Sequence, residues 1–222
     1  MSNTCLSTFF LFKPDYQLVS RHCNLWRNFH DIQDSWESIV AIIDFFGDNQ
    51  EVLTAHVGPG RWIDPDMLMI GNFHLTPGQA RVQMAVWSIL PAPLLMSNDL
   101  RSIKPVFKNI LLNPKVISIN QDPLGFSGRV IYKNNNLEIW TKPILPSNQE
   151  ETSLAVLFLN RSEFTKISKI VLKELGLRSP NGYFVLSVFS DKRYGFLLPN
   201  ATLALHIAAM DVIMLKCELI VK

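Results

Sequence analysis

The chain has 222 residues, a length that suits one large domain or two modest ones and is ample to bury a hydrophobic core. Hydrophobic residues make up 48% of it and charged residues 18%, which is typical of a globular protein. The net charge of +2 gives no electrostatic reason to expect nucleic acid or an acidic membrane surface as a partner. We therefore expect a small, neutral partner.

The longest apolar runs, such as residues 88–96, are too short to cross a bilayer and contain prolines, so we expect no transmembrane helix. Residues 1–12 include the run FFLF but have neither a basic start nor a cleavage-like pattern of small residues. They do not resemble a signal peptide. If the protein is secreted, this chain does not show how.

The three cysteines have no spacing that is typical of a zinc site, so we expect no metal. Cys5 and Cys23 could close a loop in an oxidising compartment, which would leave Cys217 as a buried free thiol. Triplets that begin at Asn160 and Asn200 match the glycosylation sequon. We expect glycans there if the chain enters the secretory path.

From residue 22 to about 120, extended and helical signals alternate as in repeated β/α units. Three units are visible. Their extended segments are 22–29, 54–72 and 91–99, and the helices that follow are expected at 34–53, 76–90 and 104–120. Asp34 or Ser35 can cap the first helix, and Thr76 with Pro77 reads as the start of the second. One face of the first helix is expected to carry Trp36, Ile39, Val40, Ile43 and Phe46.

The character of the chain changes after the turn cluster at 121–125. Runs rich in Val, Ile, Leu and Phe alternate with Asn, Ser, Pro and Gly turns. The expected strand segments are 129–133, 137–143, 153–160, 166–175, 183–189 and 201–222. This pattern predicts an antiparallel sandwich of roughly 95 residues.

In each β/α unit a polar cluster lies after the extended segment and before the helix, where parallel-sheet and barrel enzymes place their active sites. The members of these clusters are Arg27, Asp31, Asp64, Asp66 and Asp99. On their spacing alone, Arg27 and Asp31 favour an ion pair on a surface loop. The alignment of three successive clusters favours an active site.

Several aspartates beside Trp26 and Trp62 suit glycoside hydrolysis, which uses two carboxyl groups and aromatic faces that pack on sugar rings. Enolisation and metal-assisted hydrolysis also use aspartates. They favour additional His, Glu or Lys at the strand ends, and these are scarce here.

Four segments in order, CNLWRNFHDIQDSW, GPGRWIDPDMLMIGNF, APLLMSNDLR and INQDPLG, resemble the later half of glycoside hydrolase family 27, the α-galactosidase and α-N-acetylgalactosaminidase group. The resemblance covers residues 13 to about 195, and its first segment is closer to the α-N-acetylgalactosaminidases. It implies an α/β plus all-β fold, with the C-terminal part of a (β/α)8 TIM barrel at 1–122 and an antiparallel β-sandwich at 123–222. It also implies retaining hydrolysis of terminal α-galactosyl or α-N-acetylgalactosaminyl groups.

The resemblance further implies roles for single residues. Asp31 matches the general acid/base, and Arg27 matches a residue that contacts sugar hydroxyls. Asp66 and Met67 match the pocket floor. A disulfide between Cys5 and Cys23 matches the pair that brackets the recognition loop. The implied setting is lysosomal or secreted, with a carbohydrate substrate, no cofactor, and a homodimer if the full-length chain exists.

Departures from the family pattern are as informative as the matches. The family nucleophile is an aspartate in a Lys-x-Asp-Gly-Cys segment, which this sequence lacks. Lys13-Pro14-Asp15 copies only the start of that segment, so we do not assign Asp15 as nucleophile. Cys5 is followed by LSTFF in place of the family's recognition motif. Three further departures are Arg61, Ile63 and His74, of which Ile63 is expected to place an apolar side chain beside Asp64.

Three interpretations remain open. The chain is an incomplete part of an active glycosidase, or a non-catalytic carbohydrate-binding or dimerising relative, or a fragment without independent function. A barrel needs eight strands to close, whereas three units are clear here. Retaining hydrolysis also needs a second carboxyl group about 5 to 5.5 Å from the acid/base. We expect the 222 residues alone to lack that group.

Overall fold

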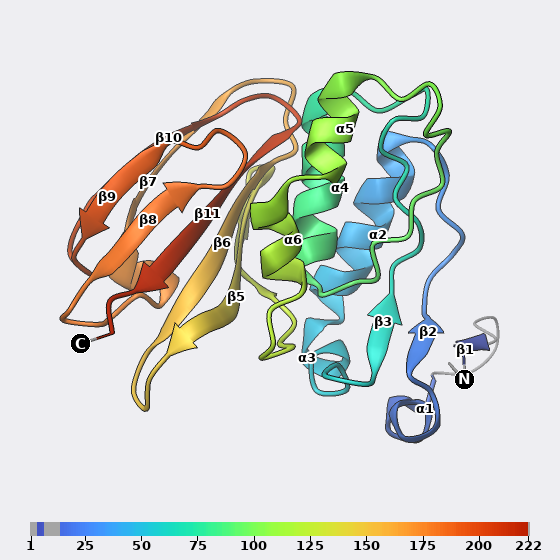
Figure 1. Cartoon of the computed structure of the whole chain (residues 1–222), viewed down its shortest axis with the longest axis horizontal. Helices are drawn as coiled ribbons and strands as arrows, with labels where there is room; N and C mark the ends of the chain where they lie inside the picture. Colours follow the sequence, from blue (N-terminus) through green and yellow to red (C-terminus); the bar gives the residue numbers. More distant parts are fainter. Residues whose placement is uncertain (1–3, 7–13, 222) are drawn as a thin grey trace.

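The computed structural model describes residues 4–6 and 14–221, with side chains described for 14–221. Two layers follow each other along the chain, a parallel sheet with helices and then an antiparallel sandwich (Figure 1). The first part contains β1 (Thr4–Leu6), α1 (Tyr16–His22), β2 (Leu25–Arg27), α2 (Trp36–Asp48), α3 (Gln50–Leu53), β3 (Trp62–Asp64), α4 (Pro77–Ile89), α5 (Pro105–Leu111) and α6 (Pro114–Asn120). None of the described helices is long and apolar enough to cross a membrane.

Strands β1, β2 and β3 form a parallel sheet in that order. Arg27 pairs in register with Asp64, and Leu25 with Trp62, so these four side chains share one face of the sheet. The opposite face carries Trp26 and is buried against the helices. Within the described residues the sheet has three strands and does not close into a barrel.

The first two predicted β/α units are confirmed, and the third is wrong in one respect. Residues 91–99 form no strand and make only an isolated bridge between Leu68 and Met96. Pro91 and Pro93 have no N–H to donate to a sheet, and the carbonyl of Leu95 accepts the N–H of Leu68 instead. A further unit, β1–α1–β2, escaped prediction, because its strand is only three residues long.

Helices α2 and α4 begin where the sequence predicts. Ser35 caps α2 by accepting the N–H of Ser38, and Ile39, Ile42, Ile43 and Phe46 are the buried face. Trp36 and Val40 are half-buried rather than buried, because the face of α2 that packs against the core is narrower than expected. Thr76 and Gln79 form a capping box on α4, with Pro77 in its first turn.

The second part contains eight strands and a short helix. They are β4 (Arg129–Asn134), β5 (Leu137–Ser147), β6 (Thr152–Asn160), β7 (Lys166–Val171), η1 (Leu172–Leu175), β8 (Tyr183–Ser187), β9 (Arg193–Leu197), β10 (Thr202–Ile207) and β11 (Asp211–Leu219). The predicted sandwich is confirmed. A six-stranded antiparallel sheet, in the order β4-β5-β6-β11-β8-β9, packs on a two-stranded sheet of β7 and β10. Strand β9 was missed, because its half-exposed RYGFL lacks a strong apolar alternation.

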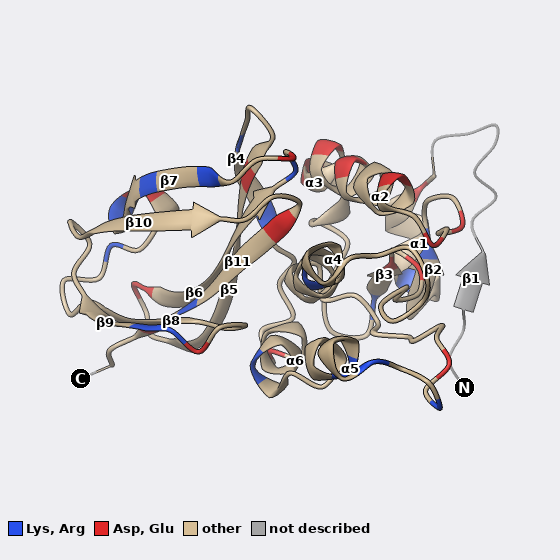
Figure 2. Ribbon diagram, turned by 90° about the horizontal axis from the view of Figure 1, so that it is seen from above, with Lys and Arg blue, Asp and Glu red and all other residues tan. Residues whose placement is uncertain are grey.

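The six-stranded sheet is covered on both faces. Val156 and Phe158 of β6 face the sandwich core with Leu205 of β10, whereas Leu157 and Leu159 join the core around α4. Because both faces are buried, β6 has no period-two alternation and reads as one apolar run. Viewed from above, α4 lies in the middle of the molecule, between the parallel strands and the six-stranded sheet (Figure 2). One continuous core therefore spans the predicted boundary at 122/123.

Charged groups also join the two parts. Arg81 of α4 donates its Nε–H to Asp211 of β11 at 3.0 Å. Arg161, after β6, donates to Asp44 of α2 at 2.8 Å, and its second nitrogen lies 2.9 Å from the buried Glu138. These contacts are largely shielded from water, so they constrain the packing of α2 and α4 on the sandwich more than surface pairs would.

A buried lysine lies where the sandwich meets two helix ends. Lys142 of β5 is fully buried, and its Nζ donates to the carbonyls of Ser88 at 3.0 Å and Ile119 at 2.7 Å. Both carbonyls are in the last turns of their helices, α4 and α6, where the helix dipole is negative. Burial lowers the pKa of Lys142 to about 7, and the charge of Asp122 opposes that shift.

Replacing Lys142 by Met should alter how stability depends on pH. Between about pH 7 and 10.5 the unfolded lysine holds a proton that the folded one has lost, so the free energy of unfolding of the parent rises with pH in this window. The contribution has a slope of at most about 1.4 kcal/mol per pH unit. Urea unfolding at several pH values should show the slope in the parent and its loss in Lys142→Met.

Lys169→Met is the matched control for this test, because Lys169 is exposed on β7. It should keep the slope of the parent. Equal slopes for the parent and Lys142→Met would contradict the assignment of the titration to Lys142.

Candidate functional site

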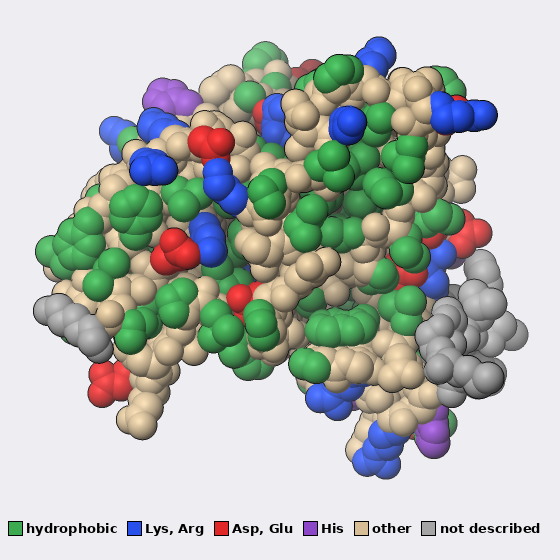
Figure 3. Space-filling view, in the orientation of Figure 1, with side chains coloured by type: hydrophobic (Ala, Val, Ile, Leu, Met, Phe, Trp, Pro, Cys, Tyr) green, Lys and Arg blue, Asp and Glu red, His purple; other side chains and the backbone are tan. Residues whose placement is uncertain are grey.

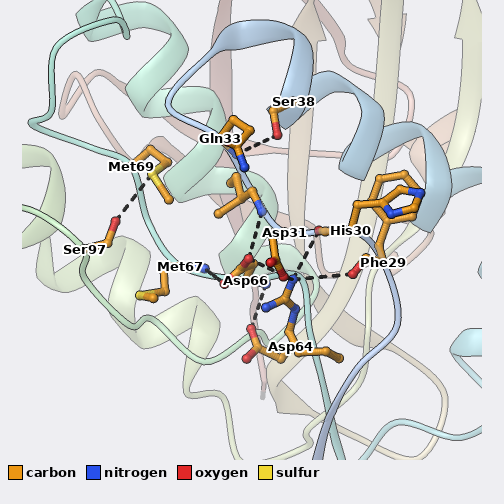
Figure 4. Close-up of polar contacts among 12 residues, drawn as sticks. Phe29, His30, Asp31, Gln33, Ser38, Asp64, Asp66, Met67, Met69 and Ser97 are labelled. Atoms are coloured by element: carbon orange, nitrogen blue, oxygen red, sulfur yellow. Dashed lines mark hydrogen bonds and ion pairs between the residues drawn. The ribbon is translucent and has the colours of Figure 1, made fainter. Parts of the chain in front are cut away.

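The candidate site lies where β2 and β3 end. Arg27 is the last residue of β2 and Asp64 the last of β3, and the parallel register places them side by side. The carboxyl ends of parallel strands meet at one edge of a sheet, so the loops that follow these two strands meet there as well. Asp31 comes from the loop after β2 and Asp66 from the loop after β3 (Figure 4).

The guanidinium of Arg27 connects the two loops. Its Nη2 lies 2.8 Å from Oδ2 of Asp66 and 3.1 Å from Oδ1 of Asp31, and it also donates to the carbonyl of His30 at 3.2 Å. The side chain of Arg27 is 19% exposed and that of Asp31 is 88% exposed. The cation is thus recessed, and the Asp31 carboxylate stands over it in contact with solvent.

Asp66 is buried and uses its polar atoms within the protein. Oδ2 accepts the N–H of Ile32 at 2.8 Å, and Oδ1 accepts the N–H of Met67 at 2.8 Å. The N–H of Asp66 donates to Oδ1 of Asp64 at 2.8 Å, and its carbonyl accepts the indole N–H of Trp87 at 2.7 Å. Its φ of 82° lies in the left-handed region, which a non-glycine residue adopts at a cost.

Asp64 is the buried carboxyl group beside Arg27. Burial is the largest influence and raises its pKa, while the N–H of Asp66 and the charge of Arg27 pull the pKa down. The carboxylate charge of Asp66 adds to the upward shift. Asp64 therefore holds a proton at higher pH than an ordinary aspartate.

Helix α4 fixes the loop that follows β3. The amide of Gln83 accepts the N–H of Met69 at 2.9 Å and donates to the carbonyl of Met67 at 3.1 Å. With the Trp87 bond to Asp66, three side-chain contacts from one helix hold the backbone of residues 66–69. Met67 is 42% exposed on this fixed backbone, and it lies beside Asp66 in Figure 4.

The structure brings four of the five predicted site residues together, namely Arg27, Asp31, Asp64 and Asp66. Asp99 instead pairs with the exposed Arg101, whose hydrogen bonds lower the pKa of Asp99. Ile63 does not lie beside Asp64 as expected, because successive strand residues alternate, and its side chain is buried on the opposite face. Among the described residues, no cluster of His, Cys, Asp and Glu is suited to a metal ion.

Sequence reasoning missed three residues that shape the site. Gln83 and Trp87 lie in an apolar helical run, where they read as core, although a buried amide needs a hydrogen-bonding partner. Asp34 was considered as a helix cap. It accepts instead the N–H of Phe73 at 2.9 Å and contacts the ring of His74 at 3.0 Å, which ties the loop after β2 to the approach to α4.

The structure describes the side chains of Cys23 and Cys217. Cys23 is disulfide-bonded and buried. The side chain of Cys5 lies outside the described residues, so the pairing of Cys5 with Cys23 stays a prediction. Cys217 is free and buried as expected, and burial raises its pKa to about 12. Asp15 caps α1 by accepting the N–H of Leu18, which suits a structural role.

The two sequons occupy opposite environments. Asn200 is exposed in the turn between β9 and β10, and a glycan there stays a prediction. Asn160 is fully buried, and its amide donates to the carbonyls of Phe164, Ile207 and Ala208 while its oxygen accepts from Ser162. A glycan on Asn160 is incompatible with this fold, because the nitrogen that would carry it is enclosed and fully used.

Asn160→Ala should therefore lower the free energy of unfolding by about 2 to 4 kcal/mol, because three carbonyls lose a donor in a buried site. Chemical denaturation measures this directly. Asn200→Ala is the exposed control and should stay within about 0.5 kcal/mol of the parent. Similar denaturation midpoints for Asn160→Ala and Asn200→Ala would show that the buried amide of Asn160 does not stabilise the sandwich.

Asp64→Asn should remove a pH dependence of stability. Because the folded pKa is raised, the folded state holds a proton between pH 3.8 and its raised pKa that the unfolded state has lost. The contribution of Asp64 to the free energy of unfolding therefore falls as pH rises through that window. Urea unfolding between pH 4 and 7 should show this fall as a difference between the parent and Asp64→Asn, because the variant lacks the contribution.

Asp99→Asn is the control with the opposite sign. The pKa of Asp99 is lowered, so its contribution is lost as pH falls, and it is small because the pair with Arg101 is exposed. The prediction for Asp64 fails if Asp64→Asn keeps the slope of the parent.

The sequence of the chain is similar to those of known proteins. The family profile described as alpha galactosidase A matches residues 5–122. The alpha-N-acetylgalactosaminidase of Gallus gallus is 46% identical over 81% of this chain and 44% of its own. Alpha-galactosidase A of Homo sapiens is 41% identical over 93% of this chain and 48% of its own. The chain thus spans about half the length of the curated relatives it matches.

Solved structures show the same fold. Alpha-galactosidase I of Mortierella vinacea superposes with a TM-score of 0.74 at 20% identity, over 91% of this chain and 55% of its own. A family 27 β-L-arabinopyranosidase of Geobacillus stearothermophilus superposes with a TM-score of 0.75 at 23% identity, over 92% of this chain and 47% of its own. On the profile match and these relatives, the chain belongs to the α-galactosidase and α-N-acetylgalactosaminidase family of glycosidases, glycoside hydrolase family 27.

Proposed function

We propose that this chain supplies the acid/base side of a retaining glycosidase site for terminal α-linked galactosyl or N-acetylgalactosaminyl groups of glycans and glycolipids. The observation that carries the proposal is Asp31, an exposed carboxyl group held over the recessed guanidinium of Arg27 at the strand ends. Relatives named α-N-acetylgalactosaminidase and α-galactosidase support the substrate class.

In this proposal Asp31 in its protonated form donates to the departing glycosidic oxygen, and as a carboxylate it then takes a proton from the attacking water. Arg27 keeps donors near the sugar hydroxyls, and Met67 offers an exposed apolar surface at the pocket floor. The guanidinium holds the Asp31 side chain through the contact between Nη2 and Oδ1 at 3.1 Å.

The proposal needs a second carboxylate about 5 to 5.5 Å from the first, on the other side of the sugar. Asp64 and Asp66 are the neighbours in the described part of the chain, and both are buried and bonded within the protein. Neither is free to attack a sugar carbon. We propose that the nucleophile belongs to a part of the protein that these 222 residues do not include.

The same reasoning extends to the architecture. We propose that β1–β3 are consecutive strands of a (β/α)8 barrel in a domain at 1–122, followed by the sandwich domain at 123–222. Figure 3 shows apolar side chains spread over the face that carries α5 and α6. Leu100, Val106 and Leu112, which lie in or near α5 in the sequence, are exposed. Together with a parallel sheet of three strands that does not close within the described residues, these exposed apolar side chains support a larger assembly. A homodimer in a lysosomal or secreted setting remains part of the proposal.

Hydrolysis of p-nitrophenyl α-galactoside and p-nitrophenyl α-N-acetylgalactosaminide tests the catalytic proposal. The chain alone should show no turnover. Co-expression with the part of the Gallus gallus relative that lies outside the match should restore turnover that Asp31→Asn reduces by about 10²- to 10⁴-fold. Asp99→Asn should leave the rate unchanged, because Asp99 pairs with Arg101 away from the site.

Turnover by the chain alone that is lost in Asp31→Asn would contradict the need for an outside nucleophile. Restored turnover that Asp31→Asn leaves intact would contradict the role of Asp31. A second function, carbohydrate binding without catalysis, is favoured because Asp64 and Asp66, the carboxyl groups beside Arg27 and Asp31, are both buried and bonded within the protein. This function would be supported if calorimetry showed binding of N-acetylgalactosamine or galactose while neither the chain alone nor the co-expressed pair showed turnover.

A further inference from the structure

We infer that Asp66 is a positioning residue that sets the place of Asp31, rather than a ligand of the sugar. The inference rests on the proposed function of Asp31 and refines the family expectation that Asp66 lines the pocket floor. Its basis is the arrangement of bonds around one strained, buried aspartate between two loops.

The first step concerns what the Asp66 carboxylate touches. Its Oδ2 accepts the N–H of Ile32 at 2.8 Å and lies 2.8 Å from Nη2 of Arg27. Ile32 is the residue directly after Asp31 in the chain, and Arg27 is the group that contacts the Asp31 side chain. A single oxygen therefore holds Asp31 through its backbone and through its ion-pair partner.

The second step concerns availability. The side chain of Asp66 is 10% exposed, and Oδ1 accepts the N–H of Met67. Displacing Oδ2 toward a sugar would leave the buried N–H of Ile32 without its acceptor, and displacing Oδ1 would do the same to the N–H of Met67. The geometry favours an internal role over direct contact with a ligand.

The third step concerns strain. A φ of 82° is unfavourable for a non-glycine residue and persists only where the surroundings enforce it. Here the indole of Trp87 and the carboxylate of Asp64 bind the backbone of Asp66 on both sides. In this conformation Oδ1 binds the N–H of Met67 in its own loop and Oδ2 reaches the loop after β2, so that Asp66 lies beside Asp31 in Figure 4. The strained conformation is what links the two loops.

Amide hydrogen exchange by NMR on the full chain tests the inference without requiring turnover. In Asp66→Ala the amide of Ile32 should exchange at least tenfold faster than the global change in stability accounts for. Asp66→Asn keeps one acceptor oxygen and tolerates positive φ, so it should retain most of the protection. It also keeps the test decisive if Asp66→Ala does not fold.

Two variants serve as controls. Thr76→Ala removes the capping box of α4 and lowers global stability without touching the loop after β2, so it sets the exchange expected from destabilisation alone. Asp99→Ala removes an aspartate of the same type from an exposed pair and should leave the amide of Ile32 unchanged. Exchange of Ile32 in Asp66→Ala that matches Thr76→Ala would overturn the inference.

Titration with N-acetylgalactosamine, followed through the same amide signals, separates this inference from the proposed function. If the chain binds the sugar, Asp66→Ala should weaken binding at least tenfold and Asp66→Asn should restore most of it. Full affinity in Asp66→Ala would overturn the positioning role. If no variant binds the sugar, the binding proposal fails, while the exchange of Ile32 still decides whether Asp66 positions the loop.

Discussion

The packing of α4 is the constraint on which the rest of the structure depends. This helix has ten buried residues among its thirteen, because the parallel strands lie on one side of it and the six-stranded sheet on the other. A helix enclosed in this way has little freedom to rotate or slide, since protein cores are close-packed. Its side chains can therefore serve as fixed reference points for loops that have no regular structure of their own.

The second half of α4 therefore makes two kinds of contact. Gln83 and Trp87 bind backbone atoms of the loop after β3, and the last turn of the helix meets Lys142 from the sandwich. The candidate site and the junction with the sandwich thus share one rigid element. A substitution that shifts α4 would be felt at both places, which argues against treating the sandwich as an independent appendage.

Charge in the site is arranged by depth. Arg27 lies between Asp31, which faces water, and Asp66, which does not. In water a guanidinium and a carboxylate attract weakly, whereas the recessed pair is screened far less. The inner pair therefore fixes the position of the cation, and the outer carboxylate remains in contact with solvent.

The sequence predicted those features that depend on local pattern or on topology. The strand-end rule identified Arg27 and Asp64, and turn chemistry identified the start of α2 at Ser35. It could not predict the role of Asp66, because this depends on a positive φ and on a contact with Ile32, 34 residues away in the chain. Residues 91–99 form no strand because Pro91 and Pro93 cannot donate to a neighbouring strand. Whether a proline excludes a strand depends on the position of that neighbour, which local sequence does not give.

The burial of Asn160 has a consequence for biosynthesis. A glycan could reach Asn160 only before β6 is enclosed, and the acceptor triplet contains the same Asn160 and Ser162 side chains that build the internal turn. A chain modified at Asn160 could not place this amide beneath Ile207 and Ala208. In a secretory compartment, the yield of folded protein would then depend on whether Asn160 is enclosed before the transferase modifies it.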